Sequence, residues 1–531
     1  MTYSKLFSGN SELGNLPELI CEIIKYFRND FSTLYSCILV NRLWCRLAIP
    51  LLWEDPFSIY AQNFQFIEIY LGNLNEDAKQ HLVDRNLIAK NCSSTLFNYP
   101  SFIKRLNTNK IYRSIGNWHP ALMDCWTILV YRSLFKMFIE NEGNLHSFEF
   151  EYHTVLDFNY LKVTMELTLQ NPNFTCNIRN LKFSMSATNI YINMFPLLKF
   201  LCFNCNSISS FYIGYGYKDG NNTLIEKCLT KMFNTQQSIE KISFECYNSL
   251  YDSFSLLTNI SNTLKIITFY RVDFEEIINN IQEIFNQLNG LETIHIIYCY
   301  SLNSDFVQQI INVIRPFKLK SLILKYHFQV ESLQLLIQKF GSDLENFEFS
   351  KGLLHGKSKQ KRQILFESII EYCTKIKYFS LRDININLAL NLIENIKKQS
   401  LNYLNIRFYD YYGYYESKNL KNLGQILPSK LEFLKLDLIK PNYLKIFLEN
   451  FQDTFIKRLF IKIKFHEGYK DILSYIKEYI MKKKRVKYLA ILINCQDLVS
   501  LKDEVKEFEL YNIKVQKYDE SYIRDIDIVN N

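Results

Sequence analysis

The sequence predicts an α/β solenoid in which a small N-terminal module of three helices precedes a long series of strand-helix repeats. The pattern Leu-x-x-Leu-x-Leu, with Ile, Phe or Val also allowed, occurs 13 times at a mean spacing of about 28 residues. Between occurrences, stretches such as 274–288 and 306–314 carry apolar residues at helical steps. Stacked units of this kind form a horseshoe with a parallel sheet on its concave face. The occurrences begin at Leu145, Ile178, Leu198, Ile239, Leu264, Leu291, Leu319, Leu344, Ile376, Leu401, Leu431, Ile456 and Val486.

Two apolar stripes with helical spacing define the N-terminal module. Pro17 stands where a first turn tolerates proline, and Asn15 and Glu18 have the spacing of a capping box. A short middle helix is expected at 34–38, and Pro50 limits the last turn of the third helix. Three such helices bury little surface alone, so exposed apolar faces are expected. The stripes are Leu16, Leu19, Ile20, Ile23, Ile24 and Phe27, and Val40, Leu43, Trp44, Leu47, Ala48, Leu51 and Leu52.

The module resembles an F-box in the order and spacing of its residues. The resemblance rests on Leu16-Pro17-Glu18-Leu19-Ile20, Glu22-Ile23-Ile24, Phe27, Leu34, Cys37, Val40-Asn41-Arg42-Leu43-Trp44, Leu47-Ala48 and Leu51-Leu52-Trp53. Leu19 departs from the family, which more often has glutamate followed by isoleucine there. The alternative is an unrelated small helical cap.

The F-box resemblance implies that the module docks on the Skp-type adaptor of cullin-RING ubiquitin ligases while the rest of the chain captures a substrate. Some of the apolar residues must instead form the module's own core, and the sequence does not divide them. The residues carried over as adaptor-binding are Leu16, Pro17, Leu19, Ile20, Ile23, Ile24, Val40 and Trp44.

The repeats resemble leucine-rich repeat proteins, and the whole chain resembles the F-box/LRR family. On this basis residues 12–57 are the F-box and 58–144 a mostly helical connecting and capping region. Residues 145–500 are the irregular leucine-rich repeat horseshoe, and 501–531 are a C-terminal cap and tail.

A basic stripe with interleaved aromatic residues is expected on the concave face, because side chains alternate along a strand. Such a stripe suits an acidic or phosphorylated protein segment, since arginine pairs with both oxygens of such a group. The alternative is an ordinary solvated face. The basic residues are Lys325, Arg382, Arg407, Lys435, Arg458 and Lys462, and the aromatic ones are Tyr378, Tyr403, Phe433 and Tyr488.

Two tyrosine-rich runs, 211–217 and 408–415, are expected to form loops that follow a strand and emerge on one rim. Tyrosine-rich glycine loops make good contact surfaces at low entropic cost. The alternative is that these tyrosines pack on the next repeat. The candidate contact residues are Tyr212, Tyr215, Tyr411, Tyr412 and Tyr414.

Composition indicates a folded protein and does not demand nucleic acid. The net charge is 62 − 54 = +8, and 48% of the residues are hydrophobic. Cys202 and Cys205 form a lone CxxC on an expected strand, and no nucleophile, metal or cofactor motif appears. No leader and no membrane span is expected, so the chain is read as cytoplasmic, nuclear or both.

The leading hypothesis is therefore a non-catalytic subunit that recognises substrates for an SCF-type ubiquitin ligase. It binds a Skp-type adaptor, and through it a cullin, and holds an unknown protein substrate. The alternative is a leucine-rich repeat scaffold or nucleic-acid-binding solenoid that acts outside a ligase. No cofactor is called for by either.

Overall fold

The structure is a computed structural model that forms two compact units, Met1–Ile242 and Ser243–Asn531. It describes residues 17–518 except 29, 59–63, 86, 89–94, 121, 123, 142–143, 153–156, 186–190, 216–221, 237, 247–253, 276, 325–328, 351–358, 385, 409–416, 430, 439–440, 452–454, 464–469, 482–484, 494–495 and 517.

The first unit begins with the expected three helices, α1 (Pro17–Tyr26), α2 (Phe31–Ile38) and α3 (Arg42–Leu52). Pro17 lies in the first turn of α1, as predicted. Asp30 and Asn41 cap the next two helices, because their side chains accept hydrogen bonds from the backbone N–H groups of Thr33 and Trp44. The buried core of this module consists of Ile20, Ile24, Leu34, Cys37 and Ala48.

The rest of the first unit alternates strands with helices. Strands β1 to β4 pair in parallel in chain order, as a strand-helix solenoid requires. The strands are β1 (Arg105–Asn107), β2 (Ser147–Tyr152), β3 (Asn180–Met185) and β4 (Ser210–Tyr215). The helices are α4 (Phe66–Gly72), α5 (Glu76–Val83), α6 (Thr108–Trp118), α7 (Asp124–Glu140), α8 (Phe158–Gln170), α9 (Tyr191–Asn204) and α10 (Asn222–Thr235). Strand β5 (Lys241–Cys246) contains the boundary between the units.

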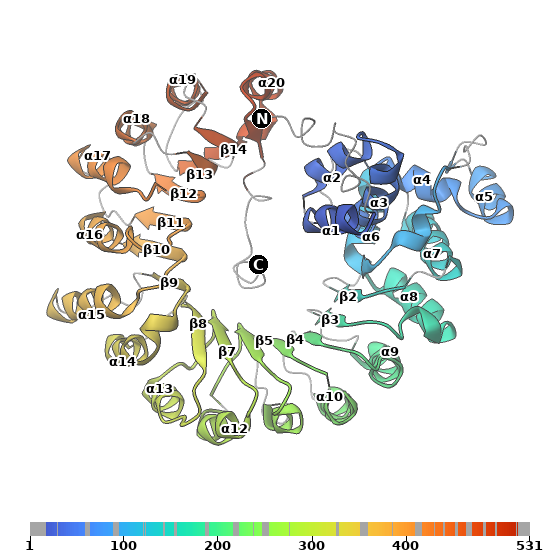
Figure 1. The fold of residues 1–531 in the computed structure, drawn as a ribbon, viewed down its shortest axis with the longest axis horizontal. Coiled ribbons are helices and arrows are strands. Elements are labelled where there is room, and N and C mark those ends of the chain that lie inside the picture. Colours follow the sequence, from blue (N-terminus) through green and yellow to red (C-terminus); the bar gives the residue numbers. More distant parts are fainter. Residues whose placement is uncertain are drawn as a thin grey trace. The chain divides into compact units, whose positions relative to one another are not determined.

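The second unit continues the same alternation, with parallel pairing of each strand to the next from β6 to β14. Within this unit the helices lie along the outer side of the strands (Figure 1). The strands are β6 (Ile266–Tyr270), β7 (Thr293–Ile297), β8 (Lys318–Ile323), β9 (Asn346–Ser350), β10 (Tyr378–Ile384), β11 (Tyr403–Phe408), β12 (Phe433–Leu438), β13 (Ile456–Ile463), β14 (Val486–Ile493), β15 (Gln496–Asp497) and β16 (Lys514–Val515). The helices are α12 (Ile281–Gln287), α13 (Ser304–Ile311), α14 (Val330–Phe340), α15 (Lys359–Tyr372), α16 (Ile386–Ile396), α17 (Ser417–Ile426), α18 (Pro441–Asn450), α19 (Lys470–Ile476) and α20 (Lys502–Leu510).

The predicted fold class is confirmed: the chain is an α/β solenoid of parallel strands alternating with helices. Every predicted start has a strand at it or close by, except Leu198. Leu198 is a buried residue of α9, and the strand of that repeat is β4. The sheet also begins earlier than Leu145. Its first strand, β1, lies inside the region 58–144, which was expected to be mostly helical, and pairs with β2.

Strand alternation positions two sets of side chains in every repeat. In β13, Leu459, Ile461 and Ile463 are fully buried on the side that the helices cover. Arg458 and Lys462 point to the opposite, helix-free side. The same alternation in the neighbouring strands makes this helix-free side a continuous surface of in-register residues.

Candidate functional site

The first candidate surface is the exposed apolar part of the three-helix module. In α1, Leu19, Ile23 and Tyr26 follow one another at helical steps along one face. Two exposed residues, Leu39 and Val40, form the turn that follows α2. Large exposed apolar side chains on so small a module are typical of a docking surface. The exposed fractions are 48% for Leu19, 88% for Tyr26, 61% for Tyr35, 72% for Leu39 and 57% for Val40.

The structure divides the apolar residues that the sequence could not divide. Ile20 and Ile24 are buried in the module core, so they are not available to a partner, and this corrects their assignment to the interface. Trp44 packs against that core and Ile23 is half-buried, whereas Leu19 and Val40 are exposed. Leu16 lies outside the described residues, and of Pro17 only the backbone is described.

Sequence reasoning missed three exposed residues of this surface, Tyr26, Tyr35 and Leu39. Helical spacing was the available signal for Tyr26, since it lies seven residues after Leu19 on the same stripe. Tyr35 and Leu39 are four residues apart at the end of α2, which also places them on one face.

The second candidate surface is the helix-free side of β9 to β14. Strand register arranges its side chains in three rows across the sheet. The rows are Asn346, Tyr378, Tyr403, Phe433, Arg458 and Tyr488; Glu348, Ser380, Asn405, Lys435, Phe460 and Ala490; and Arg382, Arg407, Asp437, Lys462 and Leu492. The expected stripe of Arg382, Arg407, Lys435, Arg458 and Lys462 is thus brought together on one side, while Lys325 lies outside the described residues.

Two acidic residues neutralise part of this stripe. Arg382 Nε lies 2.6 Å from Glu348 Oε1, and only 1% of the Glu348 side chain is exposed. Tyr378 donates its hydroxyl to the other Glu348 oxygen at 3.0 Å. Arg407 Nε donates to Asp437 Oδ2 at 2.9 Å. Two of the five basic groups are therefore ion-paired within the sheet.

Lys435 lies among the basic side chains Arg382, Arg407 and Lys462. Burial, together with Arg382, Arg407 and Lys462, lowers its pKa against the opposing effect of Asp437. Its Nζ lies 4.9 Å from the ring centre of Tyr518, and Arg458 lies over the ring of Tyr488.

Two residues of this surface, Glu348 and Asp437, and two that contact it, Tyr298 and Tyr518, were not anticipated. Glu348 occupies the same repeat position as Lys435, and Asp437 the same position as Arg407, so the register would have revealed both. Tyr298 accepts a hydrogen bond from Arg382 Nη2 across 84 residues of sequence, for which no local signal exists.

The first tyrosine run is not the loop that the sequence suggested. Tyr212 and Tyr215 lie inside β4, because the expected loop is itself the strand. Tyr212 is half-buried and its ring lies 4.9 Å from Lys182 Nζ. Tyr411, Tyr412 and Tyr414 lie outside the described residues.

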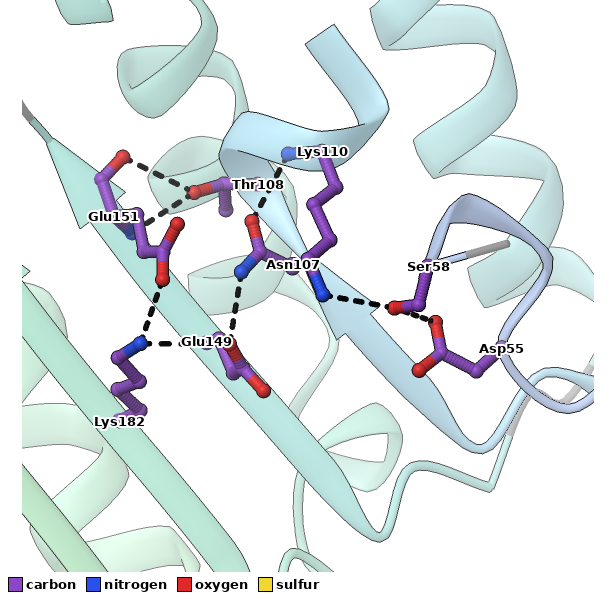
Figure 2. Close-up of polar contacts among 8 residues, drawn as sticks. All are labelled: Asp55, Ser58, Asn107, Thr108, Lys110, Glu149, Glu151 and Lys182. Carbon is purple, nitrogen blue, oxygen red and sulfur yellow. Dashed lines mark hydrogen bonds and ion pairs between the residues drawn. The ribbon is translucent and has the colours of Figure 1, made fainter. Parts of the chain in front are cut away.

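A polar network connects the segment that follows α3 to the first strands of the sheet (Figure 2). Ser58 donates to Asp55 Oδ1 at 2.6 Å, and Lys110 Nζ donates to Ser58 Oγ at 2.9 Å. Burial raises the pKa of Asp55 in spite of the Ser58 hydrogen bond. Backbone N–H groups of Lys104 and Arg105 donate to the carbonyl of Glu54. The module and the first strands are therefore tied by backbone as well as side-chain bonds.

The network continues across β1, β2 and β3 through one amide, two carboxylates and one lysine. Asn107 donates to Glu149 Oε2 at 2.8 Å, and Lys182 Nζ lies 2.7 Å from Glu151 Oε1 and 3.9 Å from Glu149 Oε2. Asn107, Glu149 and Lys182 are in register, and Glu151 contacts Lys182 diagonally, so these polar groups satisfy one another, which fits a structural role at the start of the sheet.

The lone CxxC does not lie on a strand, which corrects the sequence prediction. Cys202 is buried in α9, and Cys205 directly follows that helix. The Cys205 thiol donates to the carbonyl of Thr175 at 3.1 Å, and burial raises its pKa to about 12. Burial of this kind disfavours the thiolate form of Cys205. In the described part of the chain, no three His, Cys, Asp or Glu side chains gather as a metal site would require.

None of the described helices combines the length and apolar character needed to cross a membrane. No protein-family model matches the sequence, and no curated protein matches it. Among solved structures, the crystal structure of the Rad7 and Elc1 complex in yeast aligns with 15% sequence identity and a TM-score of 0.36. The alignment covers 69% of this chain and 86% of that chain. A likeness this distant supports no functional argument, so the fold assignment depends on the strands and helices themselves.

Proposed function

We propose that this protein is a non-catalytic substrate receptor whose three-helix module docks on a Skp-type adaptor of a cullin-RING ubiquitin ligase. The observation that carries the proposal is the exposed apolar surface of the module, Leu19, Tyr26, Tyr35, Leu39 and Val40. These side chains lie on a module with its own buried core, so they are not needed to hold it together.

The attachment of the module supports a positioning role. Trp53, directly after α3, packs edge to face on Tyr70 with ring centres 5.2 Å apart. Arg28 in the module also forms an ion pair of 2.9 Å with buried Glu54. A module held in this way keeps a fixed orientation relative to the first repeats of its own unit, which a positioning role requires of that unit.

The substrate, in this proposal, binds the helix-free side of the repeats as a protein segment with acidic or phosphorylated groups. Arg458 and Lys462 supply positive charge beside aromatic Phe433 and Tyr488. Arg382 and Arg407 are already ion-paired with Glu348 and Asp437, so in this proposal the contacts to the substrate come from Arg458 and Lys462.

Direct binding of a purified Skp-type adaptor to the full chain tests the docking proposal. The double substitution Leu19→Asp and Val40→Asp is expected to weaken adaptor binding at least about 100-fold, since it places charge in an apolar interface. Isothermal titration calorimetry measures the affinity, and circular dichroism checks that the chain stays folded.

Ile314→Asp is the matched control, because Ile314 is 85% exposed and lies outside the module. It should leave adaptor affinity unchanged. The docking proposal fails if the unmodified chain does not bind the adaptor, or if both sets of substitutions weaken binding equally.

A further inference from the structure

A side chain from near the C-terminus sits on the helix-free side of the second unit. Tyr518 is buried and packs in one cluster with Phe433, Phe460 and Ala490. These three residues belong to β12, β13 and β14 and face away from the helices. Tyr518 therefore occupies the surface on which a bound segment would lie.

Polar contacts hold Tyr518 in a specific position. Its hydroxyl donates to Asp437 Oδ1 at 3.3 Å, across 81 residues of sequence, and its backbone N–H donates to Asp497 Oδ2 at 2.6 Å. Gln516 N donates to the carbonyl of Leu489 at 2.8 Å. The chain just before Tyr518 pairs in parallel with β14 as β16. Ring, hydroxyl and backbone are thus all engaged, as in a bound peptide anchor.

The thirteen residues that follow Tyr518 match the surface next to it in charge and pattern. They contain four acidic residues and one basic residue, Arg524. The run Asp525-Ile526-Asp527-Ile528 alternates charged and apolar residues in the sequence. The surface offers Arg458 and Lys462 beside apolar Phe433 and Phe460.

The neighbouring strands offer a second apolar cluster on the same helix-free side. It consists of Ile297, Tyr298, Ile323 and Tyr378, with Tyr270 and Tyr403 packed against it. Thirteen extended residues span about 43 Å at about 3.3 Å each, whereas neighbouring strands are about 4.8 Å apart. The residues after Tyr518 are long enough to reach from β13 to this cluster.

We propose that the helix-free side of β7 to β14 is a peptide-binding surface, and that its resident occupant is the protein's own C-terminal segment, residues 516–531, anchored by Tyr518. An external acidic segment binds only after it displaces this internal one. The segment then acts as a built-in competitor, whose advantage is an effective concentration in the millimolar range.

A labelled synthetic peptide of residues 516–531, titrated into the full chain and followed by fluorescence anisotropy, tests the proposal. The unmodified chain should bind the peptide weakly, and the full-length Tyr518→Ala variant at least tenfold more tightly. The same peptide with alanine in place of Tyr518 should not bind the variant. Tyr518→Phe retains the ring and loses only the hydroxyl, so it should give an intermediate affinity and guards against misfolding. Tyr511→Ala, at the end of α20, is the matched control and should behave as the unmodified chain.

Equal peptide affinity of the unmodified chain and Tyr518→Ala, including no binding to either, overturns the proposal. Concentration-dependent dimers that disappear in Tyr518→Ala also overturn it, because the occupant would then be the tail of a second copy. No ligase component enters this experiment, so its failure is separate from a failure of the adaptor-docking proposal.

Discussion

The two candidate surfaces differ in what they expose and what they bury. The module leaves large apolar side chains such as Tyr26 and Leu39 in water, above a core that is complete without them. The helix-free side of the second unit instead buries charges, and it pairs Glu348 with Arg382 and Asp437 with Arg407. A partner of the module gains by covering exposed apolar area. A partner of the sheet has to exchange contacts that the chain already makes.

This difference teaches how each surface obtains selectivity. Apolar burial is non-directional, so the module needs only a complementary groove. Buried charge is costly when left unpaired, so a segment that binds the sheet as proposed has to provide a partner for every charge whose ion pair it breaks. Substitutions should therefore affect binding alone on the module and folding as well on the sheet.

Of the predicted changes in stability, the one caused by Arg382→Met is expected to be the largest. It leaves the Glu348 carboxylate, which is 1% exposed, without its ion partner, and such a loss costs about 3–5 kcal/mol. Urea-induced unfolding followed by circular dichroism measures the change. Lys361→Met removes one partner of the half-exposed pair with Glu331 and should cost about 0–1 kcal/mol.

Adding Glu348→Gln to Arg382→Met removes both charges and should restore most of the stability. If Arg382→Met costs no more than Lys361→Met, the sheet does not depend on its buried charge and the contrast with the module is lost.

Leu34→Ala is expected to have the next largest effect, because it opens a cavity in the module core. Leu34 is fully buried, and its truncation should destabilise the three helices by about 2–4 kcal/mol. Leu39→Ala, five residues further and 72% exposed, should cost less than about 0.5 kcal/mol. Hydrogen exchange of the α1 to α3 amides reports this local stability.

Both variants should also weaken adaptor binding, but for different reasons. Leu39→Ala should weaken binding in a folded module, whereas Leu34→Ala should do so only in proportion to unfolding. Unchanged exchange rates in Leu34→Ala would mean that the buried cluster is not the module's stabilising core.

Much of the fold was predictable because a strand that is buried on one side repeats a simple alternation. The run Phe433-Leu-Lys-Leu-Asp-Leu438 in β12 has this pattern, and its strand lies where the sequence placed it. The failure at Leu198 has a physical reason. Leu198 and Leu201 are three residues apart, which fits one face of a helix as well as the start of a repeat. Pro196 also stands inside α9, at a position that usually argues against a helix.

The candidate surfaces were predictable only as far as local pattern reaches. Alternation placed Arg382 and Arg407 on one side of the sheet, but their acidic partners come from neighbouring repeats 30 or more residues away. The contact of Tyr518 with Asp437 joins the C-terminal part to β12, and no spacing rule links them. In the module, burial separates Ile20 from Leu19, which sequence could not do for adjacent apolar residues.

Lys435→Met should change the stability of the chain least. It tests whether the sheet surface disfavours a buried charge, in contrast to the module with its exposed apolar side chains. Burial and the positive groups of Arg382, Arg407 and Lys462 lower the pKa of Lys435 from its usual 10.5, despite Asp437. Between the lowered pKa and 10.5 the folded chain binds fewer protons than the unfolded chain, so stability rises with pH across that interval. Below the interval the lysine is charged in both states, and the penalty for its buried charge is fully present.

The Lys435→Met variant should accordingly have a Tm up to about 3 °C above that of the unmodified chain at pH 7, and this gain should shrink as the pH approaches 10.5. Differential scanning calorimetry of both proteins between these pH values measures the difference. Lys457→Met, at an exposed position on β13, should show a difference that does not vary in this way. A gain in Tm that grows with pH would contradict this prediction. It would mean that Asp437 and the Tyr518 ring stabilise the charge of Lys435 more than burial destabilises it.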